Sequence, residues 1–203
     1  MPTFNLERSH NRPAIGIDEA GRGPWAGPVV VAGVMFKSYD DLPDWVFQLN
    51  DSKKLSPKKR HDLFVKLLDA SEYLTYHIET IDVATIDQLN IFEATMTGMR
   101  RCIQMLRTDD EVVLVDGNRN PVKEPWCYPI IKGDGISLSI AAASVLAKVY
   151  RDNLMTQLSI QHPHYGWETN AGYGTTHHQQ ALKTHGITAH HRKSFAPIRA
   201  LSV

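Results

Sequence analysis

Apolar residues in this chain are concentrated in short runs that have the length of β-strands rather than of helices. The first two runs are separated by a turn rich in glycine and proline, Gly21-Arg22-Gly23-Pro24, which is typical of a hairpin-like start. A later run is rich in Tyr, Thr and Ile, residue types that favour extended backbone. Together the runs predict strands at about residues 14–19, 28–36, 73–81, 112–116 and 126–131.

The segments between these runs predict helices. Ser56-Pro57 is a typical helix start, because serine caps the first turn and proline fits the first helical position. We expect helices at about residues 42–50, 56–70, 82–107 and 137–160, with a break in the third near Asp87 to Asn90. This order predicts an α/β domain at residues 1–160, with a sheet that is antiparallel at its start and parallel later. A helical extension at 161–203 would form one functional unit with it.

Three of the predicted strands end on or just before an acidic residue. Asp18 and Glu19 close the first strand, Asp116 closes the fourth, and Asp134 follows the fifth. If these strands lie side by side, four carboxylates meet at one rim of the sheet, where mutual repulsion raises their pKa values. A divalent cation removes this conflict, because Mg²⁺ and Mn²⁺ prefer carboxylate and water oxygens. The pattern therefore predicts a metal site, and with it chemistry on phosphate groups.

Each acid also has a simpler interpretation. Adjacent strand residues face opposite sides, so Asp18 and Glu19 reach one site only if the strand ends or bulges beside the glycine-rich turn. Asp116 precedes Gly117-Asn118 and could simply start a turn, and Asp134 could cap the following helix. Taken one at a time these interpretations are reasonable, but their joint occurrence favours the metal site.

Asp152 competes with Asp134 for the fourth place. The two lie about 27 Å apart on a continuous helix, so they do not hold the same metal pair. Asp134 lies beside the carboxyl end of a strand, where sites in α/β proteins gather. Asp152 follows Arg151 towards the far end of the helix, where a surface ion pair is the better explanation. We therefore expect Asp134 in the site.

The positions of the charged residues along the chain are more informative than the net charge. Lys+Arg and Asp+Glu are both 22 in 203 residues, so the total favours no partner. No acidic residue follows Glu168, whereas basic residues continue, and an acidic rim flanked by basic segments suits a polyanion held by its backbone. Any single lysine is still better explained as solvated surface. The two basic groups are Lys53, Lys54, Lys58, Lys59 and Arg60, and Lys183, Arg192, Lys193 and Arg199.

Other features of the chain argue against a zinc or disulfide scaffold, a secreted protein and a membrane protein. Cys102 and Cys127 have no partner at zinc or disulfide spacing. The first ten residues contain no apolar signal region, and the longest apolar run, Val29 to Phe36, is too short to span a bilayer. We therefore expect a soluble, cytoplasmic protein that has no contact with a membrane.

The glycine-rich turn does not match a nucleotide-binding fingerprint, because Gly21-x-Gly23-x-x-x-Gly27 is one residue too long and precedes a strand. It leaves a bare backbone that can approach a sugar or phosphate, with Arg22 projecting from it. The small residues ending at Ser144 suit close packing on the sheet, and Ser144 could also contact a phosphate. Five late histidines lack a carboxylate or cysteine to complete a zinc site, so we expect them at the surface or against phosphate.

Several motifs resemble those of type 2 ribonuclease H, ribonuclease HII, over nearly the whole chain and in the family's order and spacing. They are Gly16-Ile17-Asp18-Glu19-Ala20-Gly21-Arg22-Gly23-Pro24 with Ala26-Gly27-Pro28, Asn50-Asp51-Ser52-Lys53-Lys54-Leu55, Val115-Asp116-Gly117, Lys132-Gly133-Asp134, Ile140-Ala141-Ala142-Ala143-Ser144 with Arg151-Asp152, Gly172-Tyr173-Gly174-Thr175 with His177, and His190-His191-Arg192 with Ser194-Phe195.

The resemblance implies a ribonuclease H-like fold, a five-stranded mixed sheet flanked by helices with a helical C-terminal extension. It implies a monomeric endonuclease that hydrolyses the RNA strand of RNA–DNA hybrids and incises beside ribonucleotides embedded in duplex DNA. Asp18, Glu19, Asp116 and Asp134 match the family's catalytic, metal-binding acids. Two divalent ions, Mn²⁺ or Mg²⁺, would support an in-line displacement that leaves 5′-phosphate and 3′-hydroxyl ends.

Substrate contacts also follow from the resemblance. Gly21, Arg22, Gly23 and Tyr173 match the elements that sense the ribose 2′-OH, and a buried tyrosine there would reject DNA. Further contacts are expected from Ser52, Lys53 and Ser144.

The sequence departs from the family pattern at two positions. Trp25 stands where a smaller aliphatic residue is common, and Ala171 where a basic residue often precedes Gly-Tyr. Both departures bear on substrate affinity. Two alternatives stay open: another metal-dependent nuclease of the same fold, and a non-catalytic module that binds hybrids.

Overall fold

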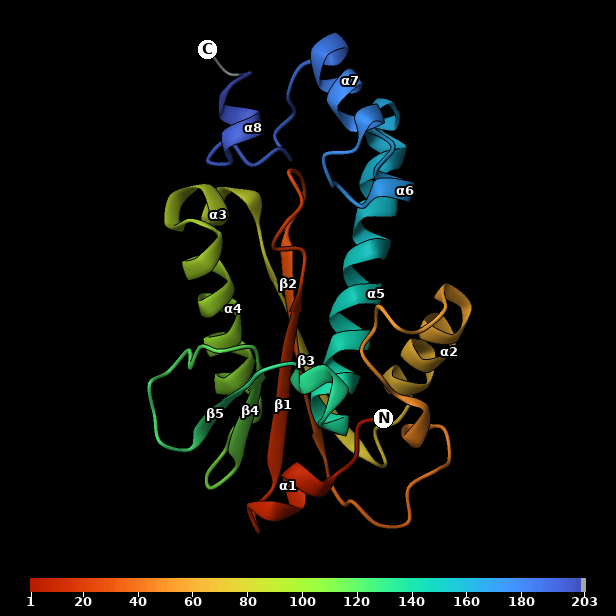
Figure 1. The fold of residues 1–203 in the computed structure, drawn as a ribbon, viewed down its shortest axis with the longest axis vertical. Helices are drawn as coiled ribbons and strands as arrows, with labels where there is room; N and C mark the ends of the chain where they lie inside the picture. The colour runs from red at the N-terminus through yellow and green to blue at the C-terminus, as the bar shows by residue number, and fades with distance from the viewer. Residues whose placement is uncertain (202–203) are drawn as a thin grey trace.

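A mixed sheet of five strands forms the centre of the molecule, in the order β3-β2-β1-β4-β5 (Figure 1). The computed structural model describes residues 1–201. β1 pairs antiparallel with β2 and parallel with β4, which confirms the predicted change of direction along the sheet. All five predicted strands are present: β1 (Ala14–Ala20), β2 (Val29–Phe36), β3 (Leu74–Ile81), β4 (Val112–Asp116) and β5 (Cys127–Ile130).

Helices cover both faces of the sheet (Figure 1). α2 (Pro57–Leu68) and α5 (Leu138–Gln161) share a hydrophobic core with β2 on one face. α3 (Val83–Leu89) and α4 (Ile91–Leu106) pack on the other. α5 lies directly against β1, because a Cβ at Gly16 would stand 2.2 Å from the carbonyl carbon of Ser139. Glycine at this position therefore sets how closely the helix approaches the strand.

Local capping explains where the helices begin. The Ser56 hydroxyl accepts a hydrogen bond from the Lys59 N–H at the start of α2, as predicted. Asn90 adopts a φ of 71° between α3 and α4, and its side chain caps α4, which confirms the predicted break. Ser137 caps α5 in the same way.

One expectation about helices was wrong, and one short helix was not expected. Residues 42–50 do not form a helix, and only the short 3₁₀ turn Val46–Gln48 is present. Pro43 within this segment restricts the backbone, and Asp41 just before it has a φ of 55°. The short helix α1 (Asn5–Ser9) was not predicted, because its support is tertiary: the Glu7 carboxylate accepts from the Ser137 hydroxyl and the Ser139 N–H at the start of α5.

The C-terminal helices gather at the end of the molecule opposite to α1 (Figure 1). After the 3₁₀ turn Pro163–Tyr165 they are α6 (Trp167–Asn170), α7 (Thr176–His185) and α8 (Ala196–Arg199). Met155 of α5, Tyr165 and Trp167 form a small hydrophobic core with side chains of α7 and α8. In the part of the chain that the structure describes, no helix is both long enough and apolar enough to cross a membrane.

The expectation that the late histidines lie at the surface or against phosphate was wrong for two of them, and one arginine of the late basic segment is buried as well. His178, His191 and Arg192 are completely buried. The sequence gave no sign of this. Arg192 donates to carbonyls of the glycine-rich turn, which is far away in the chain. The two histidines are buried because the C-terminal segments pack their rings against Tyr165 and Trp167.

Candidate metal centre and nucleic-acid pocket

The structure brings three of the four predicted acids to one point. Asp18 lies near the end of β1, Asp116 is the last residue of β4, and Asp134 lies in the 3₁₀ turn Gly133–Gly135 that follows β5. One carboxylate oxygen from each lies within 4.8 Å of the others. The parallel pairing of β1, β4 and β5 explains this, since their carboxyl ends meet at the same edge of the sheet.

Glu19 faces the opposite side of β1 from Asp18. The strand stays paired through Ala20, so the expected end or bulge at Asp18 does not occur, and neighbouring side chains alternate. Asp18 therefore points to the α5 side and Glu19 to the α4 side. Glu19 and Asp116 line a second hollow of about 320 Å³ on that side, which we call the side pocket. Asp116 thus connects the three-acid cluster to Glu19.

Short hydrogen bonds fix the orientation of these carboxylates. The Gly133 N–H donates to Asp116 Oδ1 at 2.7 Å, which ties the end of β4 to the turn that carries Asp134. Asp18 Oδ1 accepts from the Glu19 N–H, also at 2.7 Å. The guanidinium of Arg22 lies 3.3 Å from Glu19 Oε1 and supplies the nearest positive charge to that acid.

Burial disfavours the ionised forms of Asp18 and Asp134. Burial raises the pKa of Asp18 well above its usual value, and the charges of Glu19 and Asp116 raise it further. Burial raises the pKa of Asp134 to about 6, with Asp116 and Asp51 adding to the effect. Closely spaced carboxylates that resist ionisation suit a divalent cation, because its positive charge would balance their negative charges. The donor set, carboxylate oxygens alone, fits Mg²⁺ or Mn²⁺.

Asp51 also lies beside these acids, although it was not among the predicted site residues. Its Oδ1 accepts from the Lys53 N–H at 2.9 Å, and its carboxylate lies near enough to Asp134 to raise the pKa of that residue. An acid between Asn50 and Ser52 looks like an ordinary turn residue in the sequence. Its position beside Asp134 depends on the fold.

The acids lie in a larger hollow of about 460 Å³, which we call the main pocket. The Ser144 hydroxyl donates to Ser52 Oγ at 3.0 Å, so α5 and the 50–55 turn meet at its wall. The charge of Lys53 opposes the rise in the pKa of Asp134. Every predicted site residue lines this pocket: Asp18, Glu19, Gly21, Arg22, Gly23, Ser52, Lys53, Asp116, Asp134, Ser144 and Tyr173, together with Ala20, Lys148 and Arg151.

Tyr173 is exposed rather than buried, which corrects the expectation of a buried tyrosine. Its side chain is 48% exposed, and a Cβ at Gly23 would stand 3.3 Å from its Cε1 atom. The ring therefore lies over the glycine-rich turn at the mouth of the main pocket. A substrate sugar that enters between them would bury the ring on binding.

Two buried arginines hold the glycine-rich turn from beneath. Arg192 donates to the carbonyls of Gly21, Arg22, Gly27 and Pro28 at 2.6 to 3.1 Å. Arg151 donates to the carbonyls of Ala26, Pro28 and Ala171 at 2.9 to 3.1 Å. Neither has a carboxylate partner within 4 Å among residues 1–201. Because these carbonyls point inward to the arginines, the turn keeps a fixed shape at the pocket wall.

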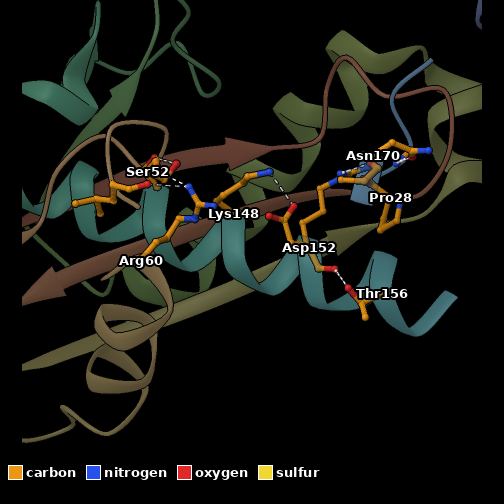
Figure 2. A network of polar contacts seen from close by, with 12 residues as sticks. Pro28, Ser52, Arg60, Lys148, Asp152, Thr156 and Asn170 are labelled. Atoms are coloured by element: carbon orange, nitrogen blue, oxygen red, sulfur yellow. Dashed lines mark hydrogen bonds and ion pairs between the residues drawn. The ribbon is translucent and has the colours of Figure 1, made fainter. Parts of the chain in front are cut away.

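Asp152 lies outside the three-acid cluster, as expected, although in the middle of α5 rather than at its far end. Its carboxylate pairs with Lys148 at 2.8 Å, and its side chain is 33% exposed (Figure 2). Figure 2 also shows how Arg60 supports the Ser52 turn, by donating to the Ser52 carbonyl at 2.5 Å.

A family model described as Ribonuclease HII matches residues 15–198. The chain belongs to the ribonuclease HII family. It is 46% identical to Ribonuclease HII of Wolbachia pipientis (strain wPip), over 98% of both chains. It is 47% identical to Ribonuclease HII of Gluconobacter oxydans, over 98% of this chain and 95% of the relative.

Solved structures of ribonuclease H2 and ribonuclease HII share the fold. The enzyme from Pyrococcus horikoshii aligns with a TM-score of 0.76 and 24% identity, over 93% of this chain and 96% of that chain. The Archaeoglobus fulgidus protein, solved in a PCNA:RNase HII complex, aligns with a TM-score of 0.73 and 25% identity, over 89% and 93%. The mixed sheet flanked by helices is therefore the ribonuclease H-like fold that the resemblance implied.

Proposed function

We propose that this ribonuclease HII hydrolyses the RNA strand of RNA–DNA hybrids and incises duplex DNA at embedded ribonucleotides, with Asp18, Glu19, Asp116 and Asp134 as its metal ligands. Family membership carries the class of reaction, a metal-dependent endonuclease. The observation that supports the residue roles is the cluster of Asp18, Asp116 and Asp134 within 4.8 Å, in a pocket walled by the glycine-rich turn.

Divalent ions supply Lewis-acid polarisation of the scissile phosphate and a lower pKa for the attacking water. The chain's own residues prepare the place for this chemistry. Asp116 is oriented by the Gly133 N–H and lines both hollows, so it would hold a cation together with Asp18 on one side or with Glu19 on the other. An attacking and a leaving oxygen on opposite sides of one phosphate would fit this arrangement. The products would carry 5′-phosphate and 3′-hydroxyl ends.

Ribose selection would take place at the mouth of the main pocket. Tyr173 lies over Gly23, and the bare backbone of the turn leaves room for a sugar beside the ring. The ribose 2′-OH would form hydrogen bonds with Tyr173 and the turn. DNA lacks this hydroxyl, so its binding would leave these polar groups without a partner. Arg22, Lys53 and Lys148 line the same pocket and would hold the neighbouring phosphates.

Several finer points belong to the same proposal. We infer that residues 1–160 and 161–203 act as one unit, because Tyr173 of the extension and Asp18 of the sheet line one pocket. The enzyme would act as a monomer and would work in the cytoplasm. Mn²⁺ and Mg²⁺ both suit the ligands; a more distant ribonuclease HIII was solved in complex with Mn²⁺.

The decisive experiment is cleavage of a DNA duplex that carries one ribonucleotide, with and without chelator. We expect a single incision beside the ribonucleotide that requires Mg²⁺ or Mn²⁺. An all-DNA duplex of the same sequence is the control. Equal cleavage of both duplexes would favour a DNA nuclease of the same fold, and binding without any cleavage would favour a non-catalytic module.

A further inference from the structure

Two buried histidines form a pair behind Tyr173, one of them in contact with its backbone, and the proposed chemistry does not use them. His178 belongs to the first turn of α7, and His191 lies in a short bridge to Ala26. Both side chains are completely buried. Their Nε2 atoms are 3.0 Å apart, so the two rings are joined edge to edge inside the C-terminal core.

The neighbours of the pair allow only one placement of its protons. His178 Nδ1 lies 2.9 Å from the carbonyl oxygen of Tyr173, which only accepts, so this nitrogen carries a hydrogen. His191 Nδ1 accepts from the Thr188 N–H at 2.9 Å, so it carries none. A neutral His191 then has its hydrogen on Nε2 and donates it to His178 Nε2. The Trp167 indole N–H donates to the same His178 nitrogen at 3.3 Å.

A charged form of either ring would break this arrangement. A proton added to His178 would place N–H groups of His178, His191 and Trp167 against one another, and one added to His191 would face the Thr188 N–H. In agreement, burial lowers the pKa of His191 to about 3 and also lowers that of His178. The pair is therefore neutral, with a fixed direction of hydrogen bonding from Thr188 to Tyr173.

The backbone of Tyr173 is confined from the other sides as well. A Cβ at Gly172 would stand 2.5 Å from the Ala26 carbonyl oxygen, and one at Gly174 would stand 2.2 Å from the Trp25 ring. The Trp25 N–H donates to the Gly172 carbonyl at 2.8 Å, which joins this segment to the glycine-rich turn. The Tyr173 carbonyl is held by two donors, the Thr175 N–H at 2.8 Å and His178 Nδ1 at 2.9 Å. His178 is the one side chain of the two, and it holds the peptide that carries the ring from the side of the C-terminal core.

We propose that His178 and His191 are positioning residues for ribose selection: the neutral pair fixes the Tyr173 peptide, so that the exposed ring is held over the glycine-rich turn before substrate binds. This inference rests on the proposed role of Tyr173 in recognising the 2′-OH. His191 acts through His178 by holding the hydrogen of His178 on Nδ1. Preorganisation of the ring would raise the rate of incision without a direct contact between either histidine and the nucleic acid.

Two substitutions of His178 separate positioning from packing. An asparagine amide reaches about as far as the histidine Nδ1, so His178→Asn retains a donor for the Tyr173 carbonyl and loses the contact with His191. A glutamine amide reaches about as far as Nε2, so His178→Gln retains the partner of His191 and loses the bond to Tyr173. Both remove the ring and fill less of the core. Exposed His177 on the same helix turn supplies the control His177→Gln.

The measurement is kcat/KM for incision of the single-ribonucleotide duplex, in wild-type and Tyr173→Ala backgrounds, with melting temperatures in parallel. We expect His178→Gln to lose about tenfold and His178→Asn less than about threefold, although both lower the melting temperature. In the Tyr173→Ala background, His178→Gln should change the value by less than about twofold, because the group it positions is gone.

Equal losses for the two variants, or a loss by His178→Gln that persists without the Tyr173 ring, would overturn the inference. If His178→Gln does not fold, His191→Gln is compared with His191→Leu, because the glutamine retains a donor to His178 and the leucine does not. Equal incision by these two variants would also overturn the inference. A Tyr173→Ala protein that incises at the wild-type rate would instead refute the ribose role of Tyr173, so the two failures are distinguishable.

Discussion

Asp116 has the most connections of the four acids. It belongs to the three-acid cluster, lines the side pocket with Glu19 and accepts the Gly133 N–H. We expect Asp116→Asn to lower incision by at least about a hundredfold at saturating Mg²⁺, because a neutral amide is a poor ligand for a hard cation. The fold should persist, since the amide oxygen can still accept from Gly133. Circular dichroism alongside the incision assay checks both; substantial activity would remove Asp116 from the site.

Asp134 and Asp152 form a matched comparison, because both competed for the fourth place in the predicted site but only Asp134 joins the cluster. Asp134→Asn should lower the turnover rate as severely as Asp116→Asn. Asp152→Asn should leave turnover within about twofold and cost a few tenths of a kcal/mol of stability, as expected for a partly exposed ion pair with Lys148. Turnover rates of the two variants at equal metal concentration decide between them, and the reverse ranking would contradict the proposed ligand set.

Tyr173 offers two separable contributions, a hydroxyl and a ring. Tyr173→Phe removes only the hydroxyl and should lower incision at a single ribonucleotide by about tenfold, the value of one hydrogen bond. Tyr173→Ala also removes the ring that lies over Gly23 and should cost more. Affinity for all-DNA duplex should change little in either variant, because it depends on phosphate contacts. Incision rates and duplex affinities at one fixed salt concentration test this; an Ala variant with the wild-type rate would exclude the role.

At the level of a structural element, the glycine-rich turn depends on a buried arginine. Arg192 donates to four carbonyls of residues 21–28, and burial lowers its pKa to about 9. Arg192→Lys retains the charge but lacks the planar fork, so several carbonyls lose their donor. We expect a loss of about 2 to 3 kcal/mol in the free energy of unfolding, and slower incision.

Urea unfolding of Arg192→Lys measures this loss, with Lys193→Gln as the control. Lys193 is the next residue and its side chain is exposed, so its substitution should stay within about 0.5 kcal/mol of wild type. A stability of Arg192→Lys equal to that of the control would show that the turn does not depend on the forked contacts.

The elements differ in how well the sequence predicted them. β1, β2 and β4 were predicted well, because a buried strand is apolar along most of its length and is bounded by turn residues. β3 is mostly exposed, and it was predicted from its Tyr, Thr and Ile residues instead. The break at Asn90 and the start at Ser56 were also predictable, since both depend on local capping. Residues 42–50 were predicted wrongly, because their apolar side chains Val46 and Leu49 are buried in the core by an irregular segment rather than by a helix.

Across the whole molecule, the arrangement of the acids followed from the order of the strands, because parallel neighbours end at the same edge. What could not be predicted is the buried polar support behind the pocket. Arg192 and Asp51 have ordinary surface residue types, and the groups they interact with lie far away in the chain. His178 contacts nearby residues, but nothing in the local pattern indicates that it is buried. Only the fold brings a donor at residue 192 to a carbonyl at residue 21, so a local pattern does not reveal it.

Metal binding connects the acids to the stability of the whole molecule. Asp134 has a pKa raised from 3.8 to about 6 in the folded protein without metal, so between these values the folded state holds a proton that the unfolded state has lost. Its contribution to stability is therefore present at low pH and is lost as pH rises from about 4 to about 6. Asp18 acts in the same direction. Asp40 and Asp82 have lowered pKa values and act in the opposite direction. Their effect cancels in the difference in the free energy of unfolding between wild type and an Asp134 variant, so this difference is the quantity to measure.

In chelator, Asp134→Asn should become more stable relative to wild type as pH rises through this window. We expect the difference in the free energy of unfolding to change by about 1 kcal/mol, less than the full shift would give, because the carboxylate is partly exposed. Saturating Mg²⁺ or Mn²⁺ should reverse the order at neutral pH, since the ion binds the ionised folded protein more tightly than the variant. Urea unfolding of both proteins from pH 4 to 7 measures this. A difference in the free energy of unfolding that does not depend on pH in chelator would mean that Asp134 does not lie against the other carboxylates. If neither metal stabilised the wild-type protein, the proposed metal centre would be refuted.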